Sequence, residues 1–197
     1  MAGMPVHHGV ESLFIDLVPS SAWFSNLRSE VLEAEWGTIK SKTFRAANYR
    51  CEACGGQGSN HPVECHERWI YDEERGVQIL LRTIALCPAC HEATHFGLAR
   101  VKGRDKEARQ QLQRVNHWTD LQVDHHVDLA MADYRRRSTR KWILDAYWLL
   151  DFIPASDPAP LSKITVQGIW DHAAGLQRRL VDLGQSESVA QNIKRWV

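Results

Sequence analysis

Two Cys-x-x-Cys pairs constrain this chain more than any other feature of its sequence. The first is Cys51-Glu-Ala-Cys54 and the second is Cys87-Pro-Ala-Cys90. Four thiolates in two such pairs can close a tetrahedral zinc site with no open position. Of the 5 cysteines only Cys65 lies outside the pairs, a pattern that fits thiolates on a metal in a reducing compartment better than a disulfide framework. We therefore expect a structural zinc ion.

A second group of metal-binding side chains surrounds the second pair. His91 follows the fourth cysteine directly and His95 comes four residues later. On a helix that begins around Pro88, these two histidines lie on one face and can share a metal ion. The run Glu64-Cys65-His66-Glu67 stands between the two cysteine pairs. A closed thiolate site beside an open, histidine-rich site indicates metal-assisted hydrolysis.

Composition limits the class of protein. The chain has 197 residues and a formal net charge of +0, so it fits one domain or two small ones, and any basic surface must be local. Its first residues have neither the positive charge nor the apolar run of a signal peptide. No apolar run approaches the ~18 residues that span a bilayer. We expect a soluble, cytoplasmic protein with no membrane association.

Periodicity and turn residues predict the organisation around the cysteines. The sequence predicts two strands of a hairpin, residues 63–71 and 77–85, joined by the polar turn 72–76. Phe14–Val18 is a strand candidate, Ser20 or Ser21 could cap a helix that runs to Leu32, and a second helix is expected over about 36–48. After residue 97 the sequence favours helices at about 105–115, 119–138, 139–150 and 166–183, with Thr119 as the N-cap of the second. The predicted division is an N-terminal helical lead-in (1–49), a zinc module (50–100) and a C-terminal helical region (101–197).

The order of these motifs resembles the HNH nucleases, a branch of the ββα-metal endonucleases that often carries paired zinc knuckles. The match covers about Arg50 to Gly97, and Leu86-Cys87-Pro-Ala-Cys90-His91 is its most specific part. The resemblance implies an α+β fold in which a zinc-stapled ββα-metal module, treble-clef-like, is embedded among helices. It also implies that Cys51, Cys54, Cys87 and Cys90 hold structural Zn²⁺, while His91 and His95 hold a catalytic divalent ion: Mg²⁺, Mn²⁺ or another.

The strand departs from the family's pattern, in which a His-His or Asp-His pair supplies one metal ligand and one general base. If His66 is the base, Cys65 stands at the ligand position; if His66 is the ligand, Glu67 becomes the base. We prefer His66 as base because its unperturbed pKa lies near working pH. Glu64 shares a strand face with His66 and is expected to orient its ring. The family usually has an asparagine a few residues before the second cysteine pair. Arg82 and Thr83 occupy that part of this sequence, and neither has a side-chain amide.

These assignments predict a metal-dependent endonuclease that hydrolyses phosphodiester bonds in DNA. Basic residues near the module are the expected nucleic-acid contacts: Lys40, Lys42, Arg45, Arg50, Arg82, Arg100 and Lys102. A further basic cluster, 135–141, is as well explained by a solvated helix face as by DNA contact. The alternative function is a non-catalytic zinc module that binds nucleic acid, or that docks a protein partner through the C-terminal helices.

Overall fold

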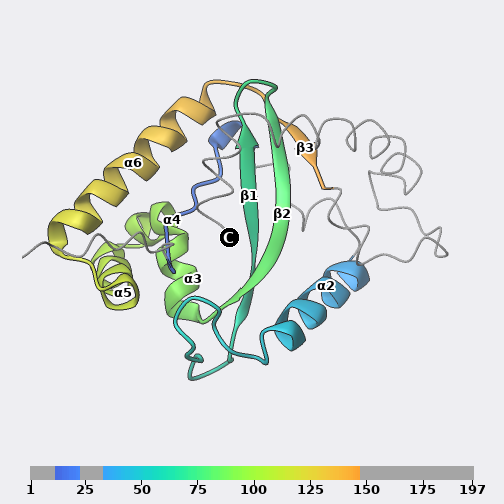
Figure 1. The fold of residues 1–197 in the computed structure, drawn as a ribbon, viewed down its shortest axis with the longest axis vertical. Coiled ribbons are helices and arrows are strands. Elements are labelled where there is room, and N and C mark those ends of the chain that lie inside the picture. The colour runs from blue at the N-terminus through green and yellow to red at the C-terminus, as the bar shows by residue number, and fades with distance from the viewer. Residues whose placement is uncertain (1–11, 23–32, 147–197) are drawn as a thin grey trace, which may run out of the picture.

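The computed structural model describes residues 12–22 and 33–146, which form an α+β fold with a three-stranded sheet and surrounding helices (Figure 1). The elements, in chain order, are η1 (Ser20–Ala22), α2 (Glu33–Ala46), β1 (Glu64–Asp72), β2 (Val77–Leu86), α3 (Pro88–Thr94), α4 (Phe96–Val101), α5 (Asp105–Asn116), α6 (Asp120–Ser138) and β3 (Ile143–Asp145). None of these helices is long and apolar enough to cross a membrane.

The predicted hairpin is confirmed. β1 pairs antiparallel with β2 from Glu64 opposite Leu86 to Asp72 opposite Val77, with one irregularity next to Arg68. The Asp72 carboxylate accepts two hydrogen bonds of 3.1 Å from backbone N–H groups of the turn. Gly76 closes the turn with φ +69°, in the left-handed region that favours glycine. The turn sequence therefore fixes the hairpin locally, as expected.

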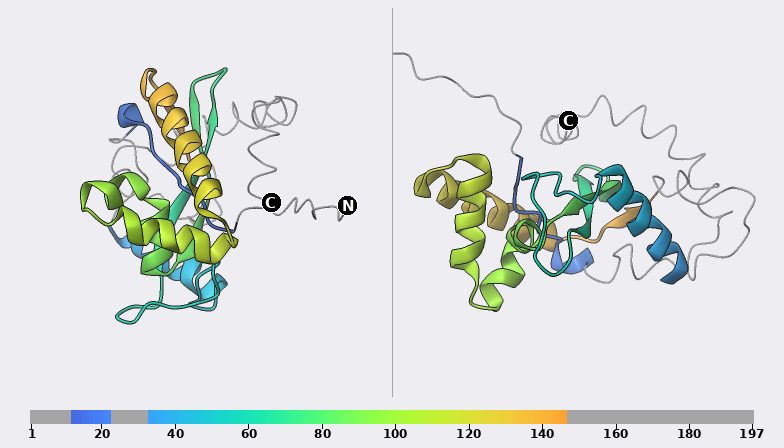
Figure 2. Two further views of the ribbon diagram at one scale, coloured as in Figure 1. Left: turned by 90° about the vertical axis from the view of Figure 1, so that its left-hand side faces the viewer. Right: turned by 90° about the horizontal axis from the view of Figure 1, so that it is seen from below.

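Helices cover the hairpin from two sides. Helix α2 lies on one side of it, and α3 to α6 gather on the other (Figure 1). The long helix α6 begins where predicted, because Thr119 and Gln122 form a reciprocal capping box. Seen from the side, α6 runs next to the N-terminal segment that leads to η1 (Figure 2, left). This packing brings chain segments more than 100 residues apart into contact.

Two predictions about secondary structure are wrong. Residues 14–18 are not a strand, because their backbone groups bond to helices: the N–H of Ile15 donates to His126 Nε2 and that of Asp16 to the Thr94 carbonyl, both at 3.0 Å. Residues 143–145 are not helical but form β3, parallel to β2, since the free edge of the hairpin offers backbone partners. The C-terminal region thus contributes a strand to the sheet. The predicted helix reaching Leu32, residues 147–150 and the helix at 166–183 lie outside the described residues.

The main hydrophobic core lies where the hairpin, α3, α5 and the N-terminal segment meet. Three of the paired cysteines, Cys51, Cys87 and Cys90, belong to it. They pack with buried apolar side chains from both ends of the described chain: Leu13, Ile15, Ile84, Leu86, Ala93, Phe96, Ala99, Ala108, Leu112 and Val123. The cysteine cluster is therefore a part of the core rather than an appendage on the surface.

Candidate metal centres

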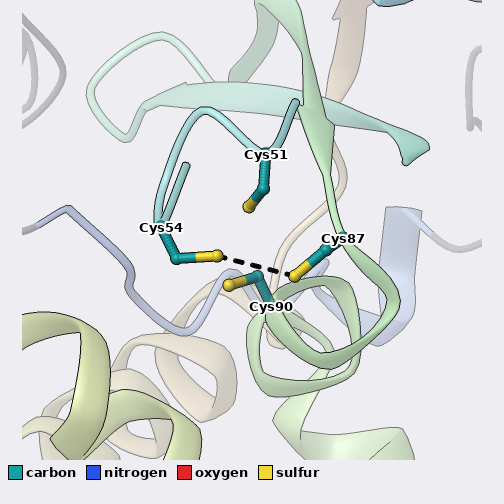
Figure 3. Close-up of side chains that lie close together, drawn as sticks. All are labelled: Cys51, Cys54, Cys87 and Cys90. Carbon is teal, nitrogen blue, oxygen red and sulfur yellow. Dashed lines mark hydrogen bonds between the residues drawn. The ribbon is translucent and has the colours of Figure 1, made fainter. Parts of the chain in front are cut away.

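The four paired cysteines converge as the sequence predicts. Cys51 and Cys54 lie in the loop between α2 and β1, Cys87 follows β2 and Cys90 lies in the first turn of α3. Their sulfur atoms point toward a common centre (Figure 3) and all lie within 4.8 Å of one another. A tetrahedron with Zn–S bonds of ~2.3 Å has S···S edges of about 3.8 Å. The Cys54–Cys87 Sγ separation is 3.7 Å, so the cluster could hold a metal ion such as zinc.

Hydrogen bonds link the cysteine side chains to one another and to Gln111. The hydrogen bond between Cys51 and Cys90 lowers the pKa of the first thiol and raises that of the second, because the two sulfurs share one proton. The side-chain amide of Gln111 also donates to Cys90 Sγ at 2.9 Å. The Glu52 carboxylate, between the first two cysteines, accepts a 2.8 Å hydrogen bond from the N–H of Ala85. The first knuckle is thereby tied to β2.

Three histidines form a second cluster, whose facing nitrogen atoms lie within 4.8 Å of one another. Nε2 of His95 lies 3.1 Å from Nδ1 of His66 and 3.1 Å from Nε2 of His91. Two nitrogens bound to one ion at ~2.1 Å lie about 3.0 Å apart in octahedral geometry and about 3.4 Å apart in tetrahedral geometry. The two separations of 3.1 Å fall between these values, so the three imidazoles could hold one metal ion.

Local structure explains how the histidines meet. Helix α3 ends at Thr94, one residue before the prediction required, but the N–H of His95 still bonds to the His91 carbonyl at 3.0 Å. This last turn keeps both rings on one side. His66 reaches them from β1, where its side chain is only 2 % exposed. The structure therefore groups His66 with His91 and His95, at the position of a third ligand.

Each of two histidines has a carboxylate next to its other ring nitrogen. Glu64 contacts Nδ1 of His91, and its second oxygen lies 2.6 Å from Nε2 of His61. It does not orient His66 as expected. That place is taken by Asp16, whose Oδ2 lies 3.5 Å from Nε2 of His66. Neither Asp16 nor His61 was predicted as a site residue; the only sequence signal for Asp16 is a carboxylate inside an otherwise apolar run.

Burial sets the charge state of this cluster. Loss of solvent lowers the pKa of His66 to about 3 and that of His95 to about 4, because it disfavours the charged imidazolium. Burial alone would raise the pKa of Asp16, but the hydrogen bond from His66 and the positive charge of Arg68 outweigh it, so that pKa is lowered. The imidazoles are neutral and the carboxylate is ionised at neutral pH. Neutral imidazoles are the form that binds metal ions.

Glu67 and Cys65 lie on the other face of the strand. Side chains alternate along β1, and Cys65 Sγ lies 3.8 Å from Thr43 Oγ1 of α2. Glu67 pairs in register with Thr83, whose hydroxyl also contacts that of Thr43 at 2.5 Å. Glu67 is thus directed toward α2 and away from the histidines, which corrects its placement as a base beside them. Burial raises the pKa of the Cys65 thiol to about 11, which disfavours the thiolate form that binds metal.

A hollow of about 790 Å³ opens next to the histidine cluster, between α3, α4 and α5. His91, His95 and Glu64 form part of its wall. The other charged side chains that line it are Glu92, Lys102, Arg104, Glu107 and Arg114. Its acidic and basic residues are equal in number, and Arg104 is held by two hydrogen bonds to Glu92, of 2.5 and 3.0 Å. The hollow therefore leaves one side of the histidine cluster open.

The basic residues that the sequence predicts to contact nucleic acid do not form one surface around the histidines. Lys102 lines the hollow, whereas Lys40, Lys42 and Arg45 belong to α2, on the opposite side of the hairpin (Figure 1). Arg82 forms an ion pair of 2.7 Å with Glu52. The two remaining residues lie at the knuckle and on α4: Arg50, whose guanidinium donates to the Gly55 carbonyl at 3.2 Å, and Arg100.

The basic cluster after residue 134 holds the hairpin. Glu73, in the hairpin turn, accepts hydrogen bonds of 2.6 and 2.8 Å from Arg136 and one of 3.1 Å from Arg137. These bonds lower the pKa of Glu73 to about 2, with Arg136 the largest cause. Arg140 donates to the backbone carbonyl of the same residue. Arg136 and Arg137 thus fasten α6 to the tip of the hairpin, and Arg140 fastens the segment that follows α6.

Comparisons with protein-family models, curated proteins and solved structures find no match to this chain, so the functional argument depends on its own residues.

Proposed function

We propose that this chain is a metal-dependent endonuclease that hydrolyses phosphodiester bonds in DNA, and that His66, His91 and His95 form its reaction centre. The observation that carries the proposal is the convergence of three neutral imidazoles, with nitrogens 3.1 Å apart, beside an open hollow. Three histidine ligands and an open position are typical of catalytic rather than structural metal sites. The adjoining cysteine cluster, with no open position, has the character of a structural site.

The arrangement around the two clusters supports the choice of chemistry. A knuckle at Cys51–Cys54, the hairpin β1–β2 and the short helix α3 follow one another, and α3 carries residues of both clusters. This order is that of the ββα-metal, treble-clef-like module which the sequence resembles. Such a unit brings a strand histidine and two helix histidines to one point, and the resemblance then favours phosphodiester hydrolysis among metal-assisted reactions.

In this proposal His66 is a metal ligand, and the alternative in which it acts as the base is set aside. A divalent ion held by the three imidazoles would polarise the phosphate and lower the pKa of water. Imidazole ligands favour ions such as Zn²⁺, Mn²⁺, Co²⁺ or Ni²⁺ over Mg²⁺, which prefers oxygen ligands. We therefore expect a transition ion rather than Mg²⁺.

Glu67, on the other face of β1, is not the base in this proposal, and Glu64 serves as the carboxylate partner of His91. Glu64 lines the hollow next to His91, and its Oε1 lies 2.6 Å from His61, whose side chain is 52 % exposed. Water on the ion would give up its proton to the solvent of the hollow. Lys102, on the same wall of the hollow, is the basic residue that we assign to a flanking phosphate.

A non-catalytic zinc module is the second candidate, and one observation favours it. Two arginines near the proposed site, Arg82 and Arg104, are occupied by ion pairs with Glu52 and Glu92. The hollow consequently lacks the excess of positive charge that usually accompanies tight binding of nucleic acid. A module that binds a protein partner would need no such excess.

Cleavage of supercoiled plasmid separates the two functions. Purified protein is incubated with Mn²⁺, Zn²⁺, Ni²⁺ or Mg²⁺, with and without chelator, beside a His95→Ala variant that keeps all four paired cysteines. An endonuclease converts plasmid to relaxed or linear forms with a transition ion, and His95→Ala abolishes this conversion while the variant remains folded. If wild-type protein with both sites loaded leaves the plasmid intact under every ion, the endonuclease proposal fails and the module alternative stands.

A further inference from the structure

Two of the three clustered histidines have a carboxylate at the ring nitrogen that faces away from the cluster. Glu64 has this position for His91, and Asp16 has it for His66. Histidines that bind metals usually donate this second N–H to a carboxylate, which fixes the tautomer and raises the basicity of the ligand nitrogen. We propose that Asp16 is a positioning residue for His66, so that the N-terminal segment 13–18, outside the hairpin–helix unit, completes the metal centre.

The geometry of His66 requires one tautomer. Its Nδ1 lies 3.1 Å from His95 Nε2, while its Nε2 lies 3.5 Å from Asp16 Oδ2. A neutral imidazole carries one proton. A proton on Nδ1 would remove the lone pair from the cluster and turn the lone pair of Nε2 against a carboxylate. With the proton on Nε2, the ring is attracted to Asp16 and presents a free lone pair to the other histidines.

Burial makes this interaction obligatory. Asp16 Oδ2 and His66 Nε2 are both inaccessible to solvent, and neither has a shorter hydrogen-bond partner among the described residues. An N–H and a carboxylate oxygen buried apart from each other would be costly, whereas a shift of a few tenths of an ångström joins them. Arg68 Nη1, 3.6 Å from the same oxygen, balances the negative charge of Asp16. The guanidinium of Arg68 lies 3.9 Å above the ring of Phe14, in the same segment.

Helices on the other side of the segment hold Asp16 in place. The side-chain amide of Asn116, at the end of α5, exchanges two hydrogen bonds with the backbone of Leu13, of 3.0 and 2.5 Å. The N–H of Asp16 bonds to the carbonyl of Thr94, the residue before His95. Asn116 therefore influences the carboxylate without belonging to the histidine cluster. It offers a second, remote way to perturb the same interaction.

The test measures Co²⁺ binding to the histidines by visible absorption, with zinc kept in the cysteine site and no nucleic acid present. We expect Asp16→Asn to weaken binding by about 10–100-fold, and Asn116→Ala to weaken it in the same direction by a smaller factor. Asp72→Asn is the matched control, since Asp72 is also buried, at 1 % exposure, but serves the hairpin turn; its affinity for Co²⁺ should equal that of the wild type. A role in folding alone would lower the melting temperature and leave the affinity unchanged.

A measurement on the wild type guards against an Asp16→Asn protein that does not fold. Nitrogen chemical shifts of His66 in the cobalt-free protein should report the Nε2–H tautomer. An Nδ1–H tautomer, an Asp16→Asn affinity within about twofold of wild type, or no Co²⁺ binding by the wild type would each overturn the inference. The inference rests on the proposed function only for the use of the metal. Co²⁺ binding that depends on Asp16, without plasmid cleavage by the wild type, refutes the endonuclease and keeps the inference. Plasmid cleavage by the wild type, with a Co²⁺ affinity that Asp16→Asn leaves unchanged, keeps the endonuclease and refutes the inference.

Discussion

Replacing Cys90 with serine should remove the fold of the module, not merely its metal. Cys90 is 0 % exposed and packs in the main core with Leu86, Phe96 and Leu112. Zinc held by cysteine-rich modules of this size contributes roughly 10–16 kcal/mol of binding free energy coupled to folding. The whole free energy of unfolding of a domain is about 5–15 kcal/mol. If the loss of this ligand releases the ion, the free energy lost is therefore comparable with the whole stability of the domain.

Cys65→Ser is the matched control for this substitution. Cys65 is the fifth cysteine and lies on the α2 side of the hairpin, where its sulfur is 3.8 Å from the Thr43 hydroxyl. A serine hydroxyl at this position has a hydrogen-bond partner, so we expect the variant to lose no more than about 1–2 kcal/mol of stability. It should keep the metal content of the wild type.

Elemental analysis and thermal unfolding of the two variants decide the matter. Unfolding can be followed by tryptophan fluorescence, because Trp69 of β1 is 3 % exposed and will become hydrated when the hairpin opens. We expect insoluble or protease-sensitive Cys90→Ser protein, and a wild-type melting temperature that falls when a strong chelator is present. Soluble Cys90→Ser protein with no zinc and an unchanged melting temperature would show that the thiolates do not hold the fold.

Three further predictions follow from individual contacts. Glu64→Gln should weaken Co²⁺ binding to the histidines by about 10–100-fold, because it removes the carboxylate beside His91 Nδ1; an affinity within about twofold of wild type would exclude this role. Lys102→Ala should weaken DNA binding and reduce its salt dependence, whereas Lys42→Ala, on the far side of the hairpin, should have a smaller effect; equal effects would mean that DNA does not enter by the hollow. Glu73→Gln should cost about 1 kcal/mol of stability in urea unfolding. Because the pKa of Glu73 in the folded protein is lowered to about 2, the difference in unfolding free energy between wild type and variant should be constant above pH ~4.5 and shrink as the pH falls toward 2. Added salt should also reduce this difference. A difference that grows as the pH falls would contradict the ion pair.

Local sequence signals accounted for the hairpin, the cysteine cluster and the start of α6. Each depends on residues close in the chain: the Asp72–Gly76 turn, the two Cys-x-x-Cys pairs, and Thr119 with Gln122. Strand alternation also limits which residues of β1 can lie beside the other histidines. Because neighbouring residues of a strand face opposite ways, His66 and Glu67 could not both face the helix that carries the other histidines. In the structure His66 is the residue that faces this helix.

Long-range packing determined what the sequence left open. Alternation correctly placed Glu64 on the face of His66, but the position of α3 decides that its carboxylate contacts His91. Asp16 precedes His66 by 50 positions in the sequence, and only the docking of its segment onto α3, α5 and α6 brings the two together. β3 similarly forms because the edge of β2 is free to accept it. No local period predicts contacts of this kind.

The two clusters depend on each other through α3. This helix has 7 residues, far fewer than the ~12–15 that make an isolated helix even marginally stable. Cys90 lies in its first turn, His91 follows, and its last carbonyls bond to the N–H groups of Asp16 and His95. Zinc bound to the thiolates would therefore fix the beginning of α3, while the N-terminal segment holds its end, so that the three imidazoles are aligned before a second ion binds. Since the thiolate site is closed and the histidine site is open, a mild chelator should empty the histidines alone, whereas removal of zinc from the cysteines should disable both sites together.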